Sequence, residues 1–467
     1  MPDITPLTPP SPIELAQALE PLAARRVECA IGDFTSIARG KRVARDDFLA
    51  LGGCKLPSVV LGLTLTGGEP EDVIGPLLPA QYIDMHLVPD LATLAPSPGR
   101  PGEATVICEP TGRWWSARHG REIDASELSP RAALRRVLAG LDAQGLRALV
   151  APELELFLLE REEAADGSVR LRGARARPGA PARESACEAL SLERLGHFDA
   201  YFDELFAGCE QLGIPVNGHA HESALSQYEV NFRPGAPLAQ ADAVFRFKRL
   251  ARDVAARHGF LASFAAKPFL DQPGTGTHWH FSLQHEAREW PHVFAQADGG
   301  DTPALGHFVA GLQAHAGAAM AFFAPHGMSY DRVVLSDAAP SHASWGPEDR
   351  SLAFRIPSAG PSARRVENRL PGGDANPYLS VALTLGLGLA GLSAGQAPQA
   401  GTADAHALPT ALPDALRHLD EDPVVRALLG HPLVDAYIGI KHHEHAERQG
   451  AADPRQQWDL RHLIELA

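Results

Sequence analysis

The chain has 467 residues, a formal net charge of −15 and a hydrophobic content of 45%. This length exceeds one ordinary hydrophobic core, so we expect two domains. The acidic balance excludes a nucleic-acid partner, because phosphate backbones demand basic surface. The longest apolar stretch, 379–392, is shorter than the roughly 20 residues that span a bilayer, and no signal peptide is evident, so we expect a cytoplasmic protein without a membrane partner. Five widely spaced cysteines without a CxxC pair are typical of buried free thiols in a reducing compartment.

The first part of the chain predicts a small sheet domain. Residues 1–12 are rich in proline and predict a flexible tail. Short β-rich runs such as VVLGLTLT (59–66) and ATVICEP then alternate with glycine and proline turns as far as about residue 109. Ser129 and Pro130, followed by apolar residues at helical spacing, predict the start of a helix. We therefore predict an α+β protein with domains at 13–125 and 126–467.

The second part contains a predicted exposed loop at 164–186 and predicted helices at 239–258 and 377–392. Gly386, Gly388 and Gly391 match the GxGxxG spacing of a dinucleotide-binding loop. That loop opens a helix after a strand, whereas these glycines lie inside an apolar helical run. We interpret them as helix-packing residues.

The segment FAAKPFLDQPGTGTHWHFSL (264–283) is the most informative one. His278 and His280 alternate with Trp279 at strand period, so both imidazoles face the same way. They follow a glycine turn that lets backbone approach a ligand, and Lys267 is one of only five lysines in the chain. The segment fits a metal or phosphate site. It also fits a strand end with a tight turn and satisfied histidines.

Acids and arginines recur in further predicted strands. Glu153 and Glu155 alternate with leucines and share a strand face, while the others flank turns or short strands: Glu222, Glu229, Arg350, Arg355, Glu367 and Arg369. Several carboxylates with a histidine suit Mg²⁺ or Mn²⁺, and arginines opposite them suit phosphoryl oxygens. The set predicts metal-dependent phosphoryl chemistry on an anionic substrate. The alternative is a group of unrelated strands that carry surface charge.

The ordered segments PELELF, HESALSQYEV, AAKPF, PGTGTHWHFSL, WGPEDRSLAFRIP and VENRLPGGDANPYL resemble the glutamine synthetase family over nearly the whole chain. Within that family the chain is most similar to the bacterial γ-glutamyl-amine ligases that act on putrescine or other polyamines. The resemblance implies an N-terminal β-grasp domain and a catalytic domain with an antiparallel β funnel. It also implies ATP as co-substrate and a homo-oligomer, such as a dodecamer, with each site at a subunit junction.

The resemblance further assigns roles to residues of this chain. One metal would be held by Glu155, Glu222 and Glu229, and the other by Glu153, His278 and Glu367. His280, Ser282 and Arg355 would lie at the nucleotide, and Arg350 at the transferred phosphoryl group. Gly274, Arg332 and Arg369 would hold glutamate.

Departures from the family pattern concern the nucleophile. The flap glutamate that closes over ammonium corresponds to Ala338, beside Asp337, and the aspartate that helps to bind ammonium corresponds to Thr64. Pro273 replaces the usual asparagine of the glycine turn. We therefore expect a ligase that joins the glutamate γ-carboxylate to an amine through a γ-glutamyl phosphate. The alternatives are an ammonia-using glutamine synthetase and a catalytically idle homologue.

Other residues have simpler interpretations. We expect Lys267 to be a phosphate contact or salt-bridge partner rather than a catalytic amine. The tract HHEH, with His442, His443 and His445, predicts a solvated helix face. Trp114 and Trp115 are expected to pack or to lie at an interface.

Overall fold

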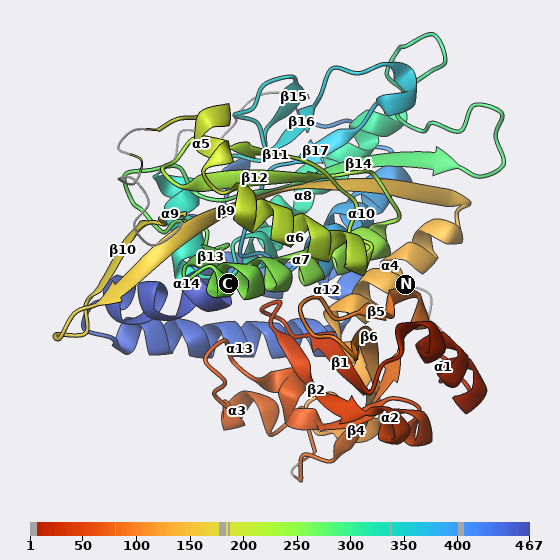
Figure 1. The fold of residues 1–467 in the computed structure, drawn as a ribbon. Helices are drawn as coiled ribbons and strands as arrows, with labels where there is room; N and C mark the ends of the chain where they lie inside the picture. Colours follow the sequence, from red (N-terminus) through yellow and green to blue (C-terminus); the bar gives the residue numbers. More distant parts are fainter. Residues whose placement is uncertain (1–6, 80, 177–183, 185–186, 336–338, 400–405) are drawn as a thin grey trace.

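The computed structural model describes residues 7–79, 81–176, 184, 187–335, 339–399 and 406–467. An N-terminal sheet domain is followed by a larger domain built on a second sheet, which confirms the predicted α+β class (Figure 1). The boundary at 125/126 stays a prediction, and α4 begins four residues later at Pro130.

The N-terminal sheet has the strand order β2-β1-β6-β4-β3, with β5 beside β6. β1 and β6 pair in parallel and the other pairs are antiparallel. The strands are β1 (Arg26–Gly32), β2 (Ala38–Ala44), β3 (Cys54–Pro57), β4 (Asp84–Pro89), β5 (Ala95–Pro96) and β6 (Glu103–Thr111), followed by the hairpin β7 (Arg113–Ser116) and β8 (Arg121–Asp124). The helical segments here are α1 (Pro12–Leu19), η1 (Glu20–Leu22), α2 (Arg45–Leu51), η2 (Ser58–Gly62), α3 (Glu71–Ile74), η3 (Leu91–Thr93) and η4 (Ala125–Leu128).

The second sheet has the strand order β11-β12-β9-β14-β17-β16-β15, and β10 and β13 also pair with β9. Its pairs are antiparallel except for β15 and β16, so the predicted antiparallel sheet is mixed at this edge. The strands are β9 (Leu146–Glu163), β10 (Val169–Gly173), β11 (Val216–His221), β12 (Gln227–Phe232), β13 (Leu261–Ser263), β14 (Thr277–His285), β15 (Trp345–Pro347), β16 (Phe354–Ile356) and β17 (Val366–Asn368).

Helices surround this sheet, and Figure 1 shows α6 and α7 lying along it and α13 running past the N-terminal domain. They are α4 (Pro130–Asp142), α5 (Leu192–Gly196), α6 (Asp199–Leu212), α7 (Pro237–Arg257), α8 (Pro303–Phe323), α9 (Gly327–Val334), η5 (Pro361–Ala363), α10 (Pro377–Ala394), α11 (Leu412–Glu421), α12 (Pro423–Leu429), α13 (His431–Gly450), the π-helical segment η7 (Arg455–Leu463) and α14 (Ile464–Leu466). The predicted helices at 130, 239–258 and 377–392 are confirmed as α4, α7 and α10.

Local sequence explains where α4 and α10 begin. The Ser129 side chain accepts a hydrogen bond from the Ala132 N–H, and Asn376 accepts from the N–H groups of the second and third residues of α10. Proline stands at the first position of both helices, where its missing N–H costs nothing.

The glycines of α10 serve helix packing, as predicted. A Cβ added at Gly391 would lie 2.1 Å from the His307 carbonyl oxygen of α8, and one at Gly386 would lie 2.4 Å from Leu428 of α12. α10 has the length and composition of a membrane-crossing helix, but 78% of it is buried inside the protein.

Three local predictions need correction. The run 59–66 is not a strand: η2 occupies its start, because Gly62 packs closely on Ile74 and the Thr64 hydroxyl accepts from the Gly68 N–H in a tight turn. Part of the predicted loop 164–186 forms β10, which extends the hairpin begun by β9; residues 177–183 and 185–186 lie outside the described residues. Of the predicted tail, Ser11 already caps α1, while residues 1–6 lie outside the described part.

The cysteine prediction holds for most positions. The thiols are free, and Cys29, Cys54, Cys108 and Cys209 are buried. Cys187 is exposed, which corrects the expectation that all five are buried.

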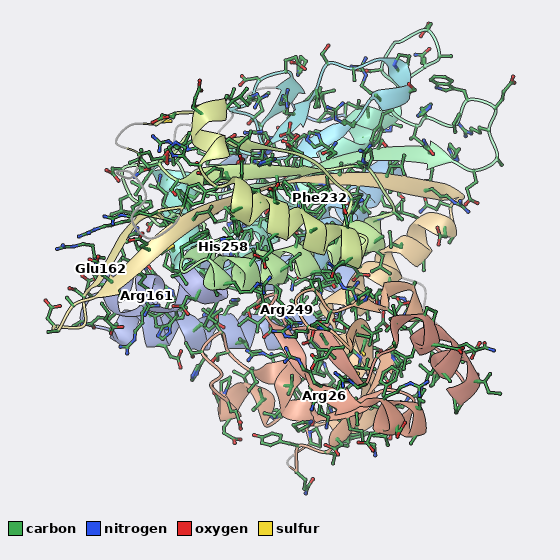
Figure 2. All side chains as sticks on the ribbon, viewed as in Figure 1. Arg26, Arg161, Glu162, Phe232, Arg249 and His258 are labelled. Atoms are coloured by element: carbon green, nitrogen blue, oxygen red, sulfur yellow. The ribbon has the colours of Figure 1, made fainter. Side chains whose placement is uncertain are left out.

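An ion pair joins the two domains. Arg249 of α7, which is labelled in Figure 2, donates to the Glu28 carboxylate of β1 at 2.8 Å, and Arg42 of β2 donates to it at 2.9 Å. Burial alone would raise the pKa of Glu28, but the two guanidinium groups outweigh it and lower the pKa to about 2. The charged carboxylate is therefore more stable in the folded protein than in the unfolded chain.

We expect Glu28→Gln to lower the free energy of unfolding at pH 7 by roughly 2 kcal/mol. The stability that Glu28 provides is present above its unfolded pKa of about 4.5 and is lost as the pH falls toward 2. The difference between wild type and variant in chemical denaturation should therefore shrink over this window. Glu69→Gln, at an exposed position of the same domain, is the control; a pH-independent difference would contradict the prediction.

Candidate active site

Four neighbouring strands bring the predicted acids and histidines together. β12 and β14 flank β9, and the registers place Glu229 opposite Glu155 and His278 opposite Glu153. β14 also pairs with β17, where His280 stands opposite Glu367. Since directly opposed residues point to the same face of a sheet, these side chains gather on one side of it.

A cavity of about 340 Å³ opens on this face. It is lined by eight of the residues predicted from the sequence, Glu155, Glu222, Glu229, Gly274, His278, Arg332, Arg350 and Arg369, and by Ser223, Gln227, Pro273, Ala339 and Ser351. Glu153, His280, Arg355 and Glu367 adjoin it through contacts with one another. Ser282 follows two residues after His280 on β14, at a half-buried position that is not part of the cavity lining.

His278 occupies the centre of the acidic group. Its Nδ1 lies 3.9 Å from Glu153 Oε2 and 3.8 Å from Glu367 Oε1, and its Nε2 lies 3.8 Å from Glu155 Oε1. In an octahedral Mg²⁺ site with bonds of about 2.1 Å, ligand atoms stand roughly 3.0–4.2 Å apart. Each of these three spacings to His278 lies in that range, so the imidazole and a neighbouring carboxylate can reach one cation.

Neither predicted triplet, Glu153 with His278 and Glu367 or Glu155 with Glu222 and Glu229, is one of the compact groups found in the described part of the chain. Among the described residues, the tight ligand groups are Glu153 with Glu229 and His278, and Glu153 with His280 and Glu367. Glu222 turns toward the N–H and hydroxyl of Ser223, at 2.7 and 2.9 Å. Like charges without a cation between them repel, which accounts for this divergence. The division into two triplets stays a prediction.

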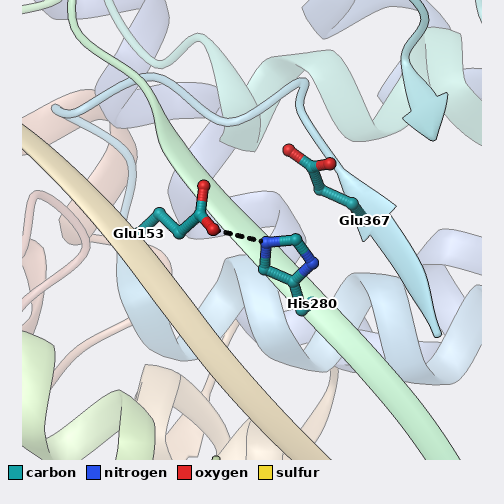
Figure 3. Close-up of side chains that lie close together, drawn as sticks. All are labelled: Glu153, His280 and Glu367. Carbon is teal, nitrogen blue, oxygen red and sulfur yellow. Dashed lines mark hydrogen bonds and ion pairs between the residues drawn. The ribbon is translucent and has the colours of Figure 1, made fainter. Parts of the chain in front are cut away.

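His280 is held in one tautomer. Arg365 Nε donates to its Nδ1 at 3.2 Å, so Nδ1 accepts and the hydrogen resides on Nε2. Nε2 then donates to Glu153 Oε1 at 2.9 Å (Figure 3). In this arrangement His280 orients the Glu153 carboxylate and has no free lone pair for a metal.

Arginines balance part of the negative charge. Glu367 is fully buried, and its two oxygens accept from Arg369 at 2.6 Å and from Arg355 at 2.7 Å. Arg332 donates to the carbonyl oxygens of Leu370 and Arg369 at 2.9 and 3.1 Å, which fixes its position at the cavity wall. Guanidinium groups placed this way can bind carboxylate or phosphate oxygens.

The remaining repulsion appears in the pKa values. Burial and the charges of Glu222 and Glu229 raise the pKa of Glu155 to about 8. Burial and the neighbouring Glu153 raise the pKa of Glu229 to about 7. A bound cation would remove this repulsion, so the donor set suits Mg²⁺ or Mn²⁺.

Two residues that line or adjoin the site escaped the sequence analysis. Gln227 is buried, and its Nε2 donates to Glu155 Oε2 at 3.1 Å and to the Gly274 carbonyl oxygen at 2.9 Å. The signal for it was its place two residues before Glu229 on the same strand face. Arg365 had no such signal, because its contact with His280 spans 85 residues.

The other interpretations have mixed outcomes. Lys267 is buried and donates to the Gln272 carbonyl oxygen within its own loop, rather than to a carboxylate. His442 is exposed and His443 and His445 are half-buried on α13, so the tract is only partly a solvated face. Trp114 is buried and donates to the Leu77 carbonyl oxygen, and Trp115 is exposed.

Of the three positions that the sequence analysis related to the nucleophile, the structure describes one. Asp337 and Ala338 lie outside the described residues. Thr64 is fully buried, and its hydroxyl accepts from the Gly68 N–H at 2.8 Å.

Comparison with known proteins places the chain in a family. The family model "Glutamine synthetase, catalytic domain" matches residues 127–461. The chain is 30% identical over 428 residues to γ-glutamylputrescine synthetase PuuA of Escherichia coli K12, covering 90% of this chain and 88% of that protein. It is 30% identical over 408 residues to glutamine synthetase of Halobacterium salinarum, covering 82% and 84%. A solved structure of the GmaS/ADP complex superposes with a TM-score of 0.76 at 26% identity, covering 96% of this chain and 98% of that one.

The chain therefore belongs to the glutamine synthetase family, and it is an ATP-dependent glutamate ligase of that family. Enzymes of this family use a divalent metal and ATP and form oligomers, and the Glu/His groups of this chain are compatible with such a metal.

We expect Glu155→Gln to flatten the pH dependence of stability in the metal-free protein. The unfolded chain releases this proton near pH 4.5 and the folded chain only near pH 8, so wild type loses stability as the pH rises through this window. Over the same pH window, the free energy of unfolding of the variant should fall by roughly 2 kcal/mol less than that of wild type. Urea denaturation with a chelator present measures it; parallel curves for both proteins would contradict the prediction.

The same variant should respond less to metal. Excess Mg²⁺ or Mn²⁺ at about a hundredfold above Kd stabilises a one-site protein by about 2.7 kcal/mol. We expect this stabilisation in wild type and a smaller one in Glu155→Gln, measured as the metal-dependent rise in Tm. Glu162→Gln, on the same strand but outside the cavity, is the matched control, and an equal rise in all three proteins would argue against Glu155 as a ligand.

Proposed function

We propose that the protein is a γ-glutamyl-amine ligase, which uses ATP to join the γ-carboxylate of glutamate to a primary amine. The observation that carries the proposal is the grouping of acids, imidazoles and guanidinium groups around one cavity, combined with a neutral, internally bonded Thr64. The cavity volume of about 340 Å³ lies within the usual range for small-molecule sites, roughly 300–1,000 Å³.

Each group of side chains has a part in the proposed reaction. Arg332 and Arg369, with the backbone at Gly274, bind glutamate at the cavity wall. Arg350 and Arg355 face the phosphoryl group, and His280 and Ser282 lie at the nucleotide. The carboxylates and His278 would hold Mg²⁺ or Mn²⁺, which neutralises phosphate oxygens when bound.

The chemistry then runs in two steps. A γ-carboxylate oxygen attacks the terminal phosphorus of ATP, which gives γ-glutamyl phosphate and ADP. The amine nitrogen attacks the acyl carbon, phosphate leaves with the carbon–oxygen electron pair, and the amine loses a proton to a carboxylate at the cavity. Arginines oppose the charge that develops on phosphate oxygens in both steps.

The choice of an amine over ammonium rests on Thr64. Identity does not decide, because an amine ligase and a glutamine synthetase are equally similar to this chain. An ammonium site needs a carboxylate to hold a small cation and take its proton, since the neutral amine attacks. The Thr64 hydroxyl carries no charge and is committed to its own turn. The family resemblance also supports a cytoplasmic homo-oligomer such as a dodecamer.

The idle-homologue alternative has less support. Buried carboxylates whose pKa values rise to about 8 and 7 reduce the stability of the fold. A protein without a cation-dependent function has no use for that arrangement.

We expect phosphate release to require ATP, Mg²⁺ or Mn²⁺, glutamate and an amine together. For at least one primary amine, kcat/KM should exceed that for ammonium by more than about tenfold at equal pH, because each buried methylene contributes about 0.8 kcal/mol that ammonium cannot. A panel of mono- and diamines with product detection measures this. Equal rates with ammonium would point to glutamine synthetase. No phosphate release with any amine of the panel, from folded protein supplied with metal, would point to an idle homologue.

A further inference from the structure

The loop from Lys267 to Gly274 carries backbone of the candidate active site. Pro273 and Gly274 line the cavity, and Gly274 packs so closely that an added Cβ would lie 2.3 Å from the Ala266 carbonyl oxygen and 3.1 Å from Arg332 Cγ. The position of this loop therefore decides how Gly274 faces Arg332.

The far end of the loop is well anchored. Gln227 Nε2 donates to the Gly274 carbonyl oxygen at 2.9 Å, and the Thr275 N–H donates to the Ala266 carbonyl oxygen at 2.9 Å. The Leu225 N–H donates to Gln272 Oε1 at 2.8 Å. The contacts from Gln227 and Leu225 come from β12 and the turn before it, and the contact of Thr275 with Ala266 joins the two flanks of the loop.

The near end of the loop is held from the C-terminal part of the chain. Arg455, the first residue of η7, donates through Nη2 to the carbonyl oxygens of Lys267 and Pro268, both at 2.9 Å. Its Nη1 contacts Asp331 Oδ2 at 3.1 Å. Asp331 immediately precedes Arg332 on α9, so one guanidinium group joins the loop to the helix that carries Arg332.

The geometry uses what is specific to arginine. The guanidinium group is a planar fork with donors on separate nitrogens, so it can bridge acceptors on two segments. Its positive charge strengthens the hydrogen bonds to the two carbonyl oxygens and to the carboxylate. A lysine ammonium at the same place could pair with Asp331 but has no fork to span both segments. The side chain is only 20% exposed, which limits competition from water.

We propose that Arg455 is a positioning residue that fixes the Lys267–Gly274 loop against α9, so that Gly274 and Arg332 keep their mutual placement. The inference rests on the proposed function, because binding of glutamate by Gly274 and Arg332 is part of it. Arg455 touches neither substrate nor metal ligands and acts through the loop and Asp331.

The test compares Arg455→Met, which removes the donors, with Arg455→Lys, which keeps the charge but not the fork. Arg461→Met, at an exposed position of η7, is the matched control. Backbone hydrogen exchange of the peptide 266–276 is measured against that of β1 and β6, together with KM for glutamate and for ATP.

We expect exchange at 266–276 to rise roughly fivefold or more in Arg455→Met, with β1 and β6 unchanged. The KM for glutamate should rise about tenfold while the KM for ATP stays within about twofold. Arg455→Lys should show the same two effects in smaller measure, and Arg461→Met should match wild type. Should Arg455→Met fail to fold, Arg455→Lys decides by the same readouts.

Two outcomes overturn the proposal: unchanged exchange at 266–276, or an increase of equal size in β1 and β6, which would mark a general loss of stability. The exchange measurement needs no turnover. An inactive wild type would therefore refute the proposed ligase, while the loop exchange still decides the role of Arg455.

Discussion

Like charges held side by side in a buried sheet are the constraint on which the second domain depends. Pairing of β9 with β12 sets Glu155 opposite Glu229 despite their mutual repulsion, and pairing of β9 with β14 sets Glu153 opposite His278. The other face of β14 supplies the compensation, since Trp279 and Phe281 alternate with the histidines and are fully buried. Apolar burial on one face thus holds the sheet together while the opposite face carries a cluster that opposes folding. Burial and the neighbouring carboxylates raise the pKa values of Glu155 and Glu229, in keeping with that opposition.

The arginines around the cavity offset part of the repulsion within this acidic cluster and leave the cavity open. Glu367 is the most deeply buried of the acids, and it has a guanidinium group on each oxygen, from Arg355 and Arg369. Glu367 can exchange its arginine partners for a cation, and the arginines can exchange Glu367 for an anion, at little electrostatic cost. When a cation approaches Glu367 and an anionic substrate approaches the arginines, every charge keeps an opposite neighbour. In the proposed reaction this is how one protein surface could receive metal, glutamate and phosphate together.

Sequence alone predicted those parts of the molecule that short-range rules control. Strand period placed Glu153 with Glu155 and His278 with His280, and capping residues located the starts of α4 and α10. The strand predicted at 59–66 was wrong. Its apolar residues alone favour strand pairing, but η2 and a local turn closed by Thr64 form there instead. The partners of Glu155 and His280 could not be predicted, since Gln227 and Arg365 reach them only through tertiary contacts. The sequence also could not predict which acids group together as possible metal ligands. That grouping depends on side-chain rotamers, which the repulsion between the carboxylates changes.

The residues that orient the acidic centre share one chemical property, which is that they donate hydrogen bonds. Glu155 accepts from the Gln227 amide and the Gly276 N–H, and Glu153 accepts from His280, whose tautomer Arg365 sets. A ring of donors orients carboxylates without adding negative charge, so the side chains are fixed while their affinity for cations is preserved. The same reasoning extends to the surrounding loop, whose carbonyl oxygens are held by Lys267 and Arg455. Cationic donors placed behind the backbone thus hold the loop at the edge of the cavity without occupying it.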